Sequence, residues 1–486
     1  MSRRLLLALD AGTTGARALV VDTSTSVLAS AYEELTVECP QPGWVELDPA
    51  KLWQSVRRVI AEALRAADAR ADEVAAVGIA NQRATTLLWE RATGAPVHPA
   101  IVWQDVRTAA RVGELLQQGF FVNTMASSTK LEWLLDHTER GRGRAARGEL
   151  CFGTVDSWLA WNLSGGRLHI TDPSNASCTG LYDFASGEWD ARGLELLDIP
   201  PSVLPAIIAT CGRHGMTEEK QCGFTAPLAA IAGDQQASMF GLARHRPGDF
   251  KVTFSTSGMV DVNTGSAPVL SASGAYPLVL WQLGGERSFC LEGTAITAGA
   301  AIQWLRDGIG IIESAAETGR IAESIEDCGG VWVVPAFQGL GTPYMDPRAR
   351  ATIGGLSRAS SRAHVVRATL EGVSFRCREV VVTLAADIGA ALPALVRADG
   401  GAAENDFLLQ HLADVLGVAV ERPETVQGTA LGAALLAGMG IGVWRDAAEM
   451  ERHWRRGAVF EPRWSEARRD EEYTRWRGAL QLSYAR

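Results

Sequence analysis

The sequence has few of the features that mark a secreted or zinc-binding protein. Its 486 residues include only eight cysteines, no two of which form a CxxC pair, and no Cys/His cluster has the spacing of zinc ligands. A short apolar run near the N-terminus stops at Asp10 with no cleavage site after it, which favours a first strand over a signal peptide. These absences predict a cytoplasmic protein whose thiols are reduced.

Long hydrophobic runs and an excess of positive charge are also missing. No stretch reaches 18 apolar residues, so we expect no membrane span and no membrane partner. The chain has 46 Lys and Arg against 56 Asp and Glu, a formal net charge of −10, which argues against a nucleic-acid partner. The remaining balance, 47% hydrophobic and 21% charged residues, is that of a globular protein with a large core.

Strand and helix patterns alternate in the first part of the chain. Residues 1–30 are predicted to form paired strands, and residues 51–70 carry helical periodicity. Asp48 is a suitable N-cap for that helix, with Pro49 at its first position. A buried strand is predicted over residues 74–82. This strand–helix–strand order indicates an α/β fold.

A charged stretch with a Pro-Gly pair, residues 244–250, divides the chain into two halves of nearly equal length. The length is enough for two or three domains. We therefore predict an N-terminal domain over residues 1–243 and a C-terminal domain over residues 244–486.

The stretch LALDAGTTGARALVVD, residues 7–22, predicts two strands joined by a tight turn of small residues. Gly12 and Gly15 give the turn the backbone freedom that a close approach to a ligand requires. The turn offers backbone N–H groups, two threonine hydroxyls and the carboxylate of Asp10. This set suits a phosphate tail with a metal ion beside it, although an ordinary hairpin turn has the same composition.

A second stretch, FKVTFSTSGMVDVNTG at residues 250–265, repeats this pattern at the start of the second half. Ser255 to Gly258 stand where Gly12 to Gly15 stood in the first hairpin. Two such hairpins suggest a duplicated domain, and together they could hold one polyphosphate from both sides. A chance match between two short turns is the alternative.

Many further motifs, in the same order from end to end, resemble those of the FGGY family of carbohydrate kinases. They include NQRAT, IVWQD, SSTKLEWLLDH, TDPSNAS, IAGDQQASMFG, AITAGAAIQWLRD and DGGAAENDFLLQHLAD, and both family signatures, around residues 130–133 and 354–371. The closest branch is the one that phosphorylates glycerol. The resemblance implies two actin-like (ribonuclease-H-like) α/β domains with a cleft between them, and transfer of the γ-phosphate of ATP to a hydroxyl.

Two aspartates have the positions that such a transfer requires. Asp234 follows an apolar strand in IAGDQQ, where its carboxylate could accept a proton from the reacting hydroxyl. An N-cap for the following helix is its alternative role, and the resemblance favours the catalytic base. Asp10 is the expected partner of Mg²⁺, with a water molecule between them, and a turn-forming aspartate is the alternative.

The resemblance also implies a set of nucleotide contacts in both halves of the chain. These are Thr13, Thr14 and Arg17 at the first hairpin, Thr256 at the second, Gly299 and Gln303 in GAAIQ, and Gly401 and Asn405 in GGAAEN. Helix packing is the alternative role of Gln303. Simple initiation of the helix expected over residues 406–417 is the alternative for Gly401 and Asn405.

The acceptor pocket departs from the pattern of the glycerol-phosphorylating branch. That branch carries NQRET, whereas this chain has NQRAT, which keeps Arg83 but places Ala84 where the family has a glutamate. Met125 replaces the usual tyrosine and Met259 the usual phenylalanine. The other substrate residues that the resemblance implies are retained, namely Trp103, Asp234 and Gln235. We expect a roomier and less polar pocket, unless both methionines are ordinary core residues.

These observations predict an ATP- and Mg²⁺-dependent kinase for a small polyol. The altered pocket leaves open a longer polyol or a ketopentose such as xylulose or ribulose. A sensor on the same fold that binds sugar and nucleotide without turnover is the alternative from another class, but both aspartates that turnover requires are present. An ATPase with a protein partner is less favoured, because no polypeptide-binding extension is evident. We also expect a homodimer or a homotetramer.

Overall fold

A computed structural model describes residues 4–484, which divide into two compact units. The first unit comprises the chain up to Gly241 together with Val279–Arg287 and Thr429–His453. The second comprises Leu242–Leu278, Ser288–Gly428 and the chain from Trp454 onward. The first unit thus includes two segments from later in the chain, so the units are not two consecutive stretches of sequence. The predicted boundary between residues 243 and 244 stays a prediction.

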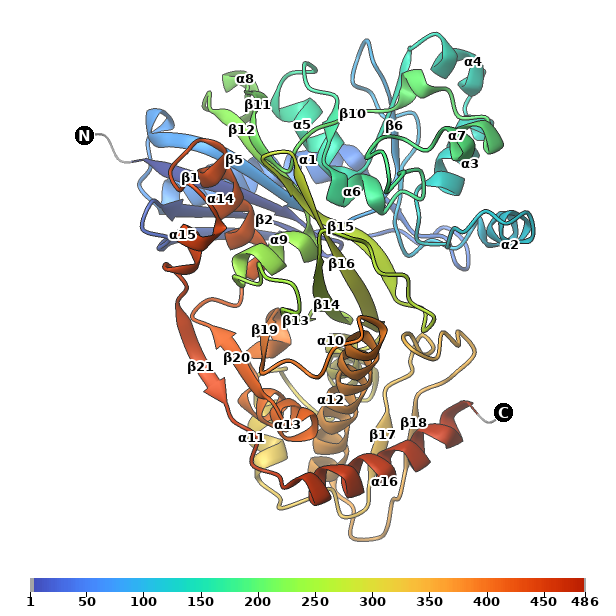
Figure 1. Cartoon of the computed structure of the whole chain (residues 1–486), viewed down its shortest axis with the longest axis vertical. Coiled ribbons are helices and arrows are strands. Elements are labelled where there is room, and N and C mark those ends of the chain that lie inside the picture. The colour runs from blue at the N-terminus through green and yellow to red at the C-terminus, as the bar shows by residue number, and fades with distance from the viewer. Residues whose placement is uncertain (1–3, 485–486) are drawn as a thin grey trace. The chain divides into compact units, whose positions relative to one another are not determined.

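The first unit is built on a six-stranded sheet with the order β11-β12-β5-β1-β2-β3 (Figure 1). The strands β1, β2 and β3 are antiparallel neighbours, β5 and β12 run parallel to β1, and β11 is antiparallel to β12. Their bounds are Leu5–Ala11 (β1), Gly15–Asp22 (β2), Val27–Glu34 (β3), Val74–Asn81 (β5), Cys211–Met216 (β11) and Pro227–Gly233 (β12).

Helix α1 of this unit confirms the predicted first helix. It spans Pro49–Ala66, and the side chain of Asp48 accepts hydrogen bonds from the backbone N–H groups of Ala50 and Lys51. The strands predicted in residues 1–30 and 74–82 are confirmed as β1, β2, β3 and β5, with residues 1–3 outside the described range.

Shorter elements complete the first unit. They are β4 (Glu46–Leu47), β6 (Leu87–Glu90), β7 (Ala100–Ile101), β8 (Leu150–Gly153), β9 (Ile170–Thr171), β10 (Ala206–Ile207), α2 (Ala109–Gln117), α3 (Ser128–His137), α4 (Gly141–Ala146), α5 (Val155–Leu163), α6 (Pro173–Ser177), α7 (Ala191–Leu196), α8 (Glu219–Cys222), α9 (Asp234–Gly241), α14 (Gly428–Gly440), α15 (Ala447–Glu451) and the 3₁₀ turns η1 (Ala71–Glu73) and η2 (Pro201–Val203).

The second sheet has seven strands in the order β15-β16-β14-β13-β19-β20-β21. Strand β14 is antiparallel to both β13 and β16, β19 and β20 run parallel to β13, and β21 is antiparallel to β20. Their bounds are Phe250–Phe254 (β13), Gly258–Gly265 (β14), Tyr276–Leu283 (β15), Glu286–Ala295 (β16), Leu395–Asp399 (β19), Ala419–Pro423 (β20) and Arg456–Phe460 (β21). The hairpin predicted over residues 250–265 is thereby confirmed.

The remaining elements of the second unit are mostly helical. They are α10 (Gly299–Gln303), the π turn η3 (Trp304–Gly308), α11 (Glu317–Glu323), α12 (Arg362–Asp387), the 3₁₀ turn η4 (Gly401–Glu404), α13 (Asp406–Leu416), α16 (Glu466–Tyr484) and the strands β17 (Trp332–Val334) and β18 (Thr352–Gly354).

The two sheets share one plan. Each has an antiparallel group led by a hairpin, then two strands parallel to the first hairpin strand, then one antiparallel strand at the outside. This repeated order supports the duplication that the two similar hairpins suggested. It also determines which loops meet, because the carboxyl ends of parallel neighbours lie at the same sheet edge.

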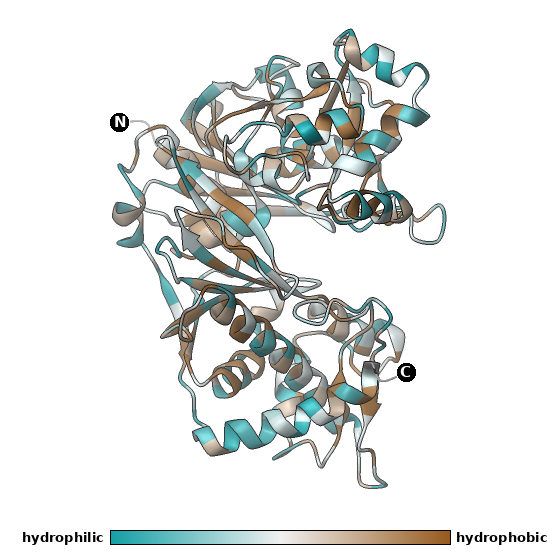
Figure 2. Cartoon of the chain, turned by 45° about the vertical axis from the view of Figure 1, so that its right-hand side comes forward, coloured by the Kyte–Doolittle hydropathy of each residue, from teal (hydrophilic) through white to brown (hydrophobic). Residues whose placement is uncertain are grey.

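Each unit has its own apolar core. Leu5, Leu7 and Leu9 of β1 belong to the first core, and Phe250, Val252 and Phe254 of β13 belong to the second. In contrast to the strands, α16 is drawn mostly in the hydrophilic colour (Figure 2). Across residues 4–484, no helix combines the length and the apolar character that a bilayer crossing demands.

Candidate active site

Three parallel strands of the first unit end at the same level. Ala11 of β1 and Gly233 of β12 are both register partners of Asn81, the last residue of β5. The residues that follow therefore leave the sheet side by side, because neighbouring strands lie about 4.8 Å apart. These residues are Gly12 and Thr13 after β1, Gln82 and Arg83 after β5, and Asp234 and Gln235 after β12.

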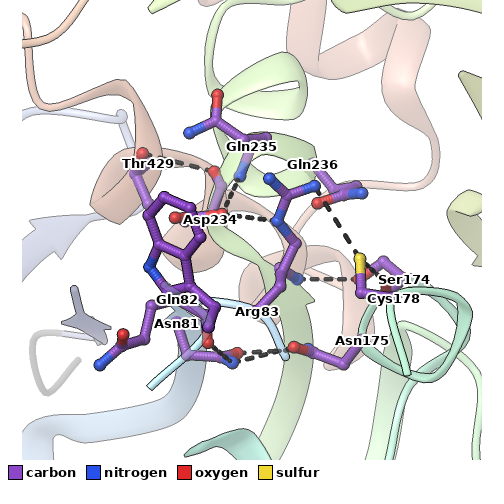
Figure 3. Close-up of polar contacts among 12 residues, drawn as sticks. Asn81, Gln82, Arg83, Ser174, Asn175, Cys178, Asp234, Gln235, Gln236 and Thr429 are labelled. Atoms are coloured by element: carbon purple, nitrogen blue, oxygen red, sulfur yellow. Dashed lines mark hydrogen bonds and ion pairs between the residues drawn. The ribbon is translucent and has the colours of Figure 1, made fainter. Parts of the chain in front are cut away.

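Arg83 and Asp234 form an ion pair at this edge (Figure 3). The Nε atom of Arg83 lies 2.9 Å from Oδ1 of Asp234, and the two side chains are 12% and 26% exposed. Asp234 also begins α9, and its Oδ1 accepts the backbone N–H of Gln235 at 2.8 Å. The carboxylate remains accessible, and its bond to the next residue is not the bond to the second or third helical N–H that defines an N-cap, so both predicted roles stay predictions.

The first hairpin turn is tied to the end of β5 through side chains. The Thr13 hydroxyl donates to Oε1 of Gln82 at 3.1 Å and accepts from the indole N–H of Trp103 at 2.9 Å. Thr85 donates to the same Gln82 oxygen at 3.0 Å, and the Gln82 amide donates to the carbonyl of Gly12 at 3.2 Å. The structure therefore brings Thr13 and Trp103 together around Gln82, a residue to which the sequence analysis assigned no role.

Two other residues of this hairpin face a different neighbour. The carbonyl of Thr14 accepts from the backbone N–H of Leu35 and from the hydroxyl of Tyr32. Arg17 lies opposite Asp10 in the strand register, and its guanidinium lies 5.0 Å from the centre of the Tyr32 ring. Thr14 and Arg17 are thus in contact with β3, away from the Thr13–Gln82–Trp103 group.

Ala84 has a left-handed backbone conformation, with a φ of 59°, and is 4% exposed. Its carbonyl accepts hydrogen bonds from the hydroxyls of Thr86 and Ser127, both at 3.0 Å. A left-handed conformation is strained for a residue with a Cβ, and these two bonds stabilise it. The NQRAT loop is therefore rigid at the position where the family has a glutamate.

Lys130 is a buried residue of this region that the sequence analysis placed in a signature without giving it a role. Its Nζ donates to the carbonyls of Trp103 at 3.0 Å and Met125 at 3.1 Å. Burial lowers the pKa of this amine to about 7, with Asp105 opposing the shift and Arg107 adding to it. Lys130 thus connects two of the predicted acceptor residues through hydrogen bonds to their backbone carbonyls.

In the second unit, the loops after the parallel strands β13 and β19 hold Thr256 and Gly401, two of the predicted nucleotide residues. The carbonyl of Thr256 accepts the N–H groups of Ala298 and Ala300, and Ser255 accepts that of Gly299. A Cβ at Gly299 would lie 2.5 Å from the Ser255 oxygen, so the helix can approach the turn only with glycine there. Thr256 and Gly299 are therefore brought together.

The GGAAEN loop reaches the same sheet edge. Gly400 has a φ of +87°, and a Cβ there would lie 2.5 Å from the carbonyl oxygen of Phe254, the last residue of β13. Gly401 begins η4 directly afterwards. Asn405 caps α13 by accepting the N–H of Leu408 at 3.1 Å, as its alternative role predicted, and it donates to Thr318 at 2.9 Å.

Two predicted residues of the second unit lie apart from this loop cluster. Gln303 is the exposed last residue of α10. Met259 is half-buried on β14, in register with Thr253 and Thr294. Met259 is not part of the apolar core of the second unit, and both its contribution to an acceptor pocket and the core alternative stay predictions.

Comparison with known proteins covers almost the whole chain. The model of the FGGY family of carbohydrate kinases matches its N-terminal domain to residues 5–241 and its C-terminal domain to residues 250–441. The chain is 47% identical to glycerol kinase from Aromatoleum aromaticum, over 98% of each chain. The crystal structure of Plasmodium falciparum glycerol kinase with ADP is similar with a TM-score of 0.90 and 29% identity, over 99% of each chain. Xylulose kinase from Rhodospirillum rubrum has a TM-score of 0.82 and 27% identity, over 99% of this chain and 98% of the other.

Proposed function

The chain belongs to the FGGY family of carbohydrate kinases, and from this premise we propose that it transfers the γ-phosphate of ATP to a hydroxyl of glycerol. The assignment of glycerol as the acceptor rests on the similarity to glycerol kinases over 98% of both chains. The longer polyol and the ketopentose are not favoured, because the chain is 47% identical to the glycerol kinase of Aromatoleum aromaticum and 27% identical to the xylulose kinase.

Asp234 is the proposed catalytic base. Its carboxylate is accessible at the end of β12, and an alcohol acceptor must lose a proton as the phosphate arrives. Arg83 holds one carboxylate oxygen at 2.9 Å, which leaves the other oxygen to face a substrate hydroxyl. Arg83 is also proposed to contact the substrate, because its guanidinium lies beside the proposed base.

The nucleotide is proposed to bind through both hairpin turns. Thr13 and Thr14 offer hydroxyls and N–H groups in the first unit, and Thr256 offers them in the second. Gly299 lets the start of α10 pack against the second turn, and Gly401 leaves the backbone at the start of η4 uncovered. Arg17, Gln303 and Asn405 stay weaker members of this set, because strand, helix-end and capping contacts account for their positions.

Magnesium is the proposed metal, with Asp10 as its protein partner. Within residues 4–484, no group of three or more His, Cys, Asp and Glu side chains could hold a metal alone. Mg²⁺ usually takes one or two carboxylates and completes its shell with water and phosphate oxygens. Asp10 lies at the end of β1 beside the first turn. When bound, the ion would neutralise part of the phosphate charge.

The acceptor is proposed to lie against Arg83, Trp103 and Gln235, with Ala84, Met125 and Met259 forming a less polar wall. Without the family glutamate at position 84, one glycerol hydroxyl lacks a carboxylate acceptor, so selectivity for glycerol should be reduced. A homodimer or homotetramer and a cytoplasmic location stay predictions.

The deciding experiment couples ADP release to a spectroscopic signal with ATP and Mg²⁺ against glycerol, erythritol, pentitols, xylulose and ribulose. We expect glycerol to give the highest kcat/KM. Turnover restricted to a four- or five-carbon acceptor would contradict the proposed acceptor. ADP release that is independent of every acceptor would contradict the kinase function itself.

A further inference from the structure

The TDPSNAS segment contains the short helix α6 and is buried next to the strand ends that form the candidate site. None of its residues has a role in the proposed reaction. Asp172 precedes helix α6, and its Oδ1 accepts the Ser174 hydroxyl at 2.8 Å and the Asn175 backbone N–H and side-chain amide at 3.0 Å each. Its Oδ2 accepts the hydroxyl of Thr210 at 2.9 Å. Asp172, Ser174 and Asn175 are all 0% exposed. Their orientations are therefore determined by this carboxylate.

Asn175 connects this element to the end of β5. Its side-chain amide donates to Oδ1 of Asn81 at 3.2 Å, and the Asn81 amide donates back to Oδ1 of Asn175 at 2.9 Å (Figure 3). Asn81 is the last residue of β5 and precedes Arg83 by two positions. Two buried amides that satisfy each other cannot separate without leaving unpaired donors and acceptors.

Ser174 connects the same element to the end of β12. Its hydroxyl accepts the backbone N–H of Gly233 at 2.8 Å, and Gly233 directly precedes Asp234. A Cβ at Gly233 would lie 2.6 Å from Cδ of Arg83, so the Arg83 stem passes over this glycine. The strand end that positions Asp234 is therefore also the surface on which Arg83 rests.

We propose that Ser174 and Asn175 are positioning residues that set the placement of Arg83 relative to Asp234. Each bonds to the last residue of one of the two strands, and Asp172 holds both from a single carboxylate. The strand register aligns Asn81 with Gly233 but does not determine the course of the chain beyond them. The kinetic consequence rests on the proposed function, in which Asp234 is the base and Arg83 its partner.

Ser174→Ala and Ser177→Ala form a matched pair for the test. Both serines belong to α6, and each hydroxyl accepts one backbone N–H, from Gly233 in the first case and from Val279 at 3.1 Å in the second. Both substitutions remove one hydroxyl and leave one buried N–H unpaired. The hydroxyls differ in their acceptor, which is Oδ1 of Asp172 for Ser174 and the carbonyl of Ser174 for Ser177, so Ser174→Ala should lower Tm somewhat more. Of the two serines, only Ser174 contacts a strand end that leads into the site.

We expect Ser174→Ala to lower kcat between about tenfold and about 100-fold, because a misplacement near 1 Å has an effect of that size. The KM for ATP should stay nearly unchanged, and Ser177→Ala should retain its kcat. Equal loss of kcat in the two variants, or full activity of a folded Ser174→Ala, would overturn the proposal.

A double-mutant cycle on Asn81 and Asn175 provides a second measurement in case Ser174→Ala does not fold. Asn81→Ala and Asn175→Ala should each lower kcat, and the double variant should be no slower than the slower single variant, since both remove one shared interaction. Additive losses of kcat would contradict a shared positioning role.

Crystal structures of Ser174→Ala and Ser177→Ala separate this inference from the proposed function. If the wild-type enzyme turns over no acceptor, the proposed function fails, but the positioning can still be measured. The Arg83–Asp234 pair should be displaced in Ser174→Ala and retained in Ser177→Ala. An unchanged pair in both variants would contradict the inference whatever the activity.

Discussion

The two hairpin turns have similar sequences but are held in different ways. In the first, GTTG, the Thr13 hydroxyl joins Gln82 and Trp103 through side-chain hydrogen bonds. In the second, STSG, the carbonyls of Ser255 and Thr256 accept backbone N–H groups from the start of α10. The first turn thus depends on particular side chains, whereas the second depends on close approach of the backbone.

Both turns are proposed to contact the nucleotide, but the first is also bonded to Trp103, a proposed acceptor residue, and the two ligands pose different recognition problems. A hydroxyl acceptor must be placed to within a fraction of an ångström of its base, which demands side chains with defined partners. A polyphosphate can be held by many N–H groups at once, which demands small residues that leave the backbone uncovered. We therefore expect substitutions at the end of β12 to lower kcat, and substitutions beside the second turn to weaken ATP binding.

The largest effect is expected at the end of β12, where side chains are proposed to place the acceptor. Asp234→Asn removes the proposed base with little change in shape, and kcat should fall about 10²- to 10⁴-fold. ATP binding, measured by calorimetry, should be retained because Asp234 is not among the proposed nucleotide contacts. Asp406→Asn is the matched control, since Asp406 also begins a helix and pairs with an arginine, Arg422, at 2.7 Å. Retained turnover in Asp234→Asn would contradict the base assignment.

The next largest effect is expected beside the second turn, where backbone segments approach each other closely. In Gly299→Ala the new Cβ would lie 2.5 Å from the Ser255 oxygen, so the turn must shift. Overpacking of this kind typically costs about 1–3 kcal/mol. If that cost falls on the ATP-binding turn, the KM for ATP should rise about tenfold, since each 1.4 kcal/mol is tenfold. Gly478→Ala, in an exposed part of α16 with open space around it, should instead stabilise the fold by about 1 kcal/mol. An unchanged KM for ATP in Gly299→Ala would remove the contrast between the two turns.

A smaller effect is expected from Lys130→Met, which removes the hydrogen bonds to the carbonyls of Trp103 and Met125. The KM for the acceptor should rise several-fold, with little change in the KM for ATP.

The stability of the fold should also change with pH because of Lys130. The pKa of Lys130 is about 7 in the fold against an ordinary 10.5, so the unfolded chain binds more protons between these values.

The free energy of unfolding of the wild-type protein should therefore gain from this residue as the pH rises from 7 to 10.5. Lys130→Met has no group to titrate and should lack that gain. Thermal unfolding of both proteins at pH 7.5 and pH 9.5 measures the difference, and other titrations cancel in the comparison. Parallel changes of Tm in the two proteins would contradict the assigned pKa shift.

The smallest effect concerns selectivity. Ala84→Glu restores the carboxylate of the glycerol-phosphorylating branch and should raise kcat/KM for glycerol relative to erythritol by a few-fold. The gain should be limited, because Ala84 is 4% exposed and its loop is bonded to Ser127 and Thr86. If the ratio of glycerol to erythritol turnover does not increase, the wall formed by Ala84, Met125 and Met259 does not control acceptor choice.

Local patterns predicted much of the fold. The cap of α1 by Asp48, both hairpins and the strand that ends at Asn81 are visible in the sequence, because capping, turn formation and burial depend on residues close together in the chain. The family resemblance is confirmed by models that match residues 5–241 and 250–441. The roles of individual site residues stay predictions.

The sequence by itself determined the fold class, the family and the list of candidate residues. Only the tertiary structure decided how those residues are paired. Lys130 bonds to Trp103, which is 27 positions away in the sequence, Asn175 to Asn81, which is 94 positions away, and Asp234 to Arg83, which is 151 positions away. Contacts between residues so far apart cannot be predicted from the periodicity of the local sequence. The contact of Asp234 with Arg83 forms because parallel strands end at a common edge, and the sheet order that creates the edge is set by long-range burial rather than by neighbouring residues.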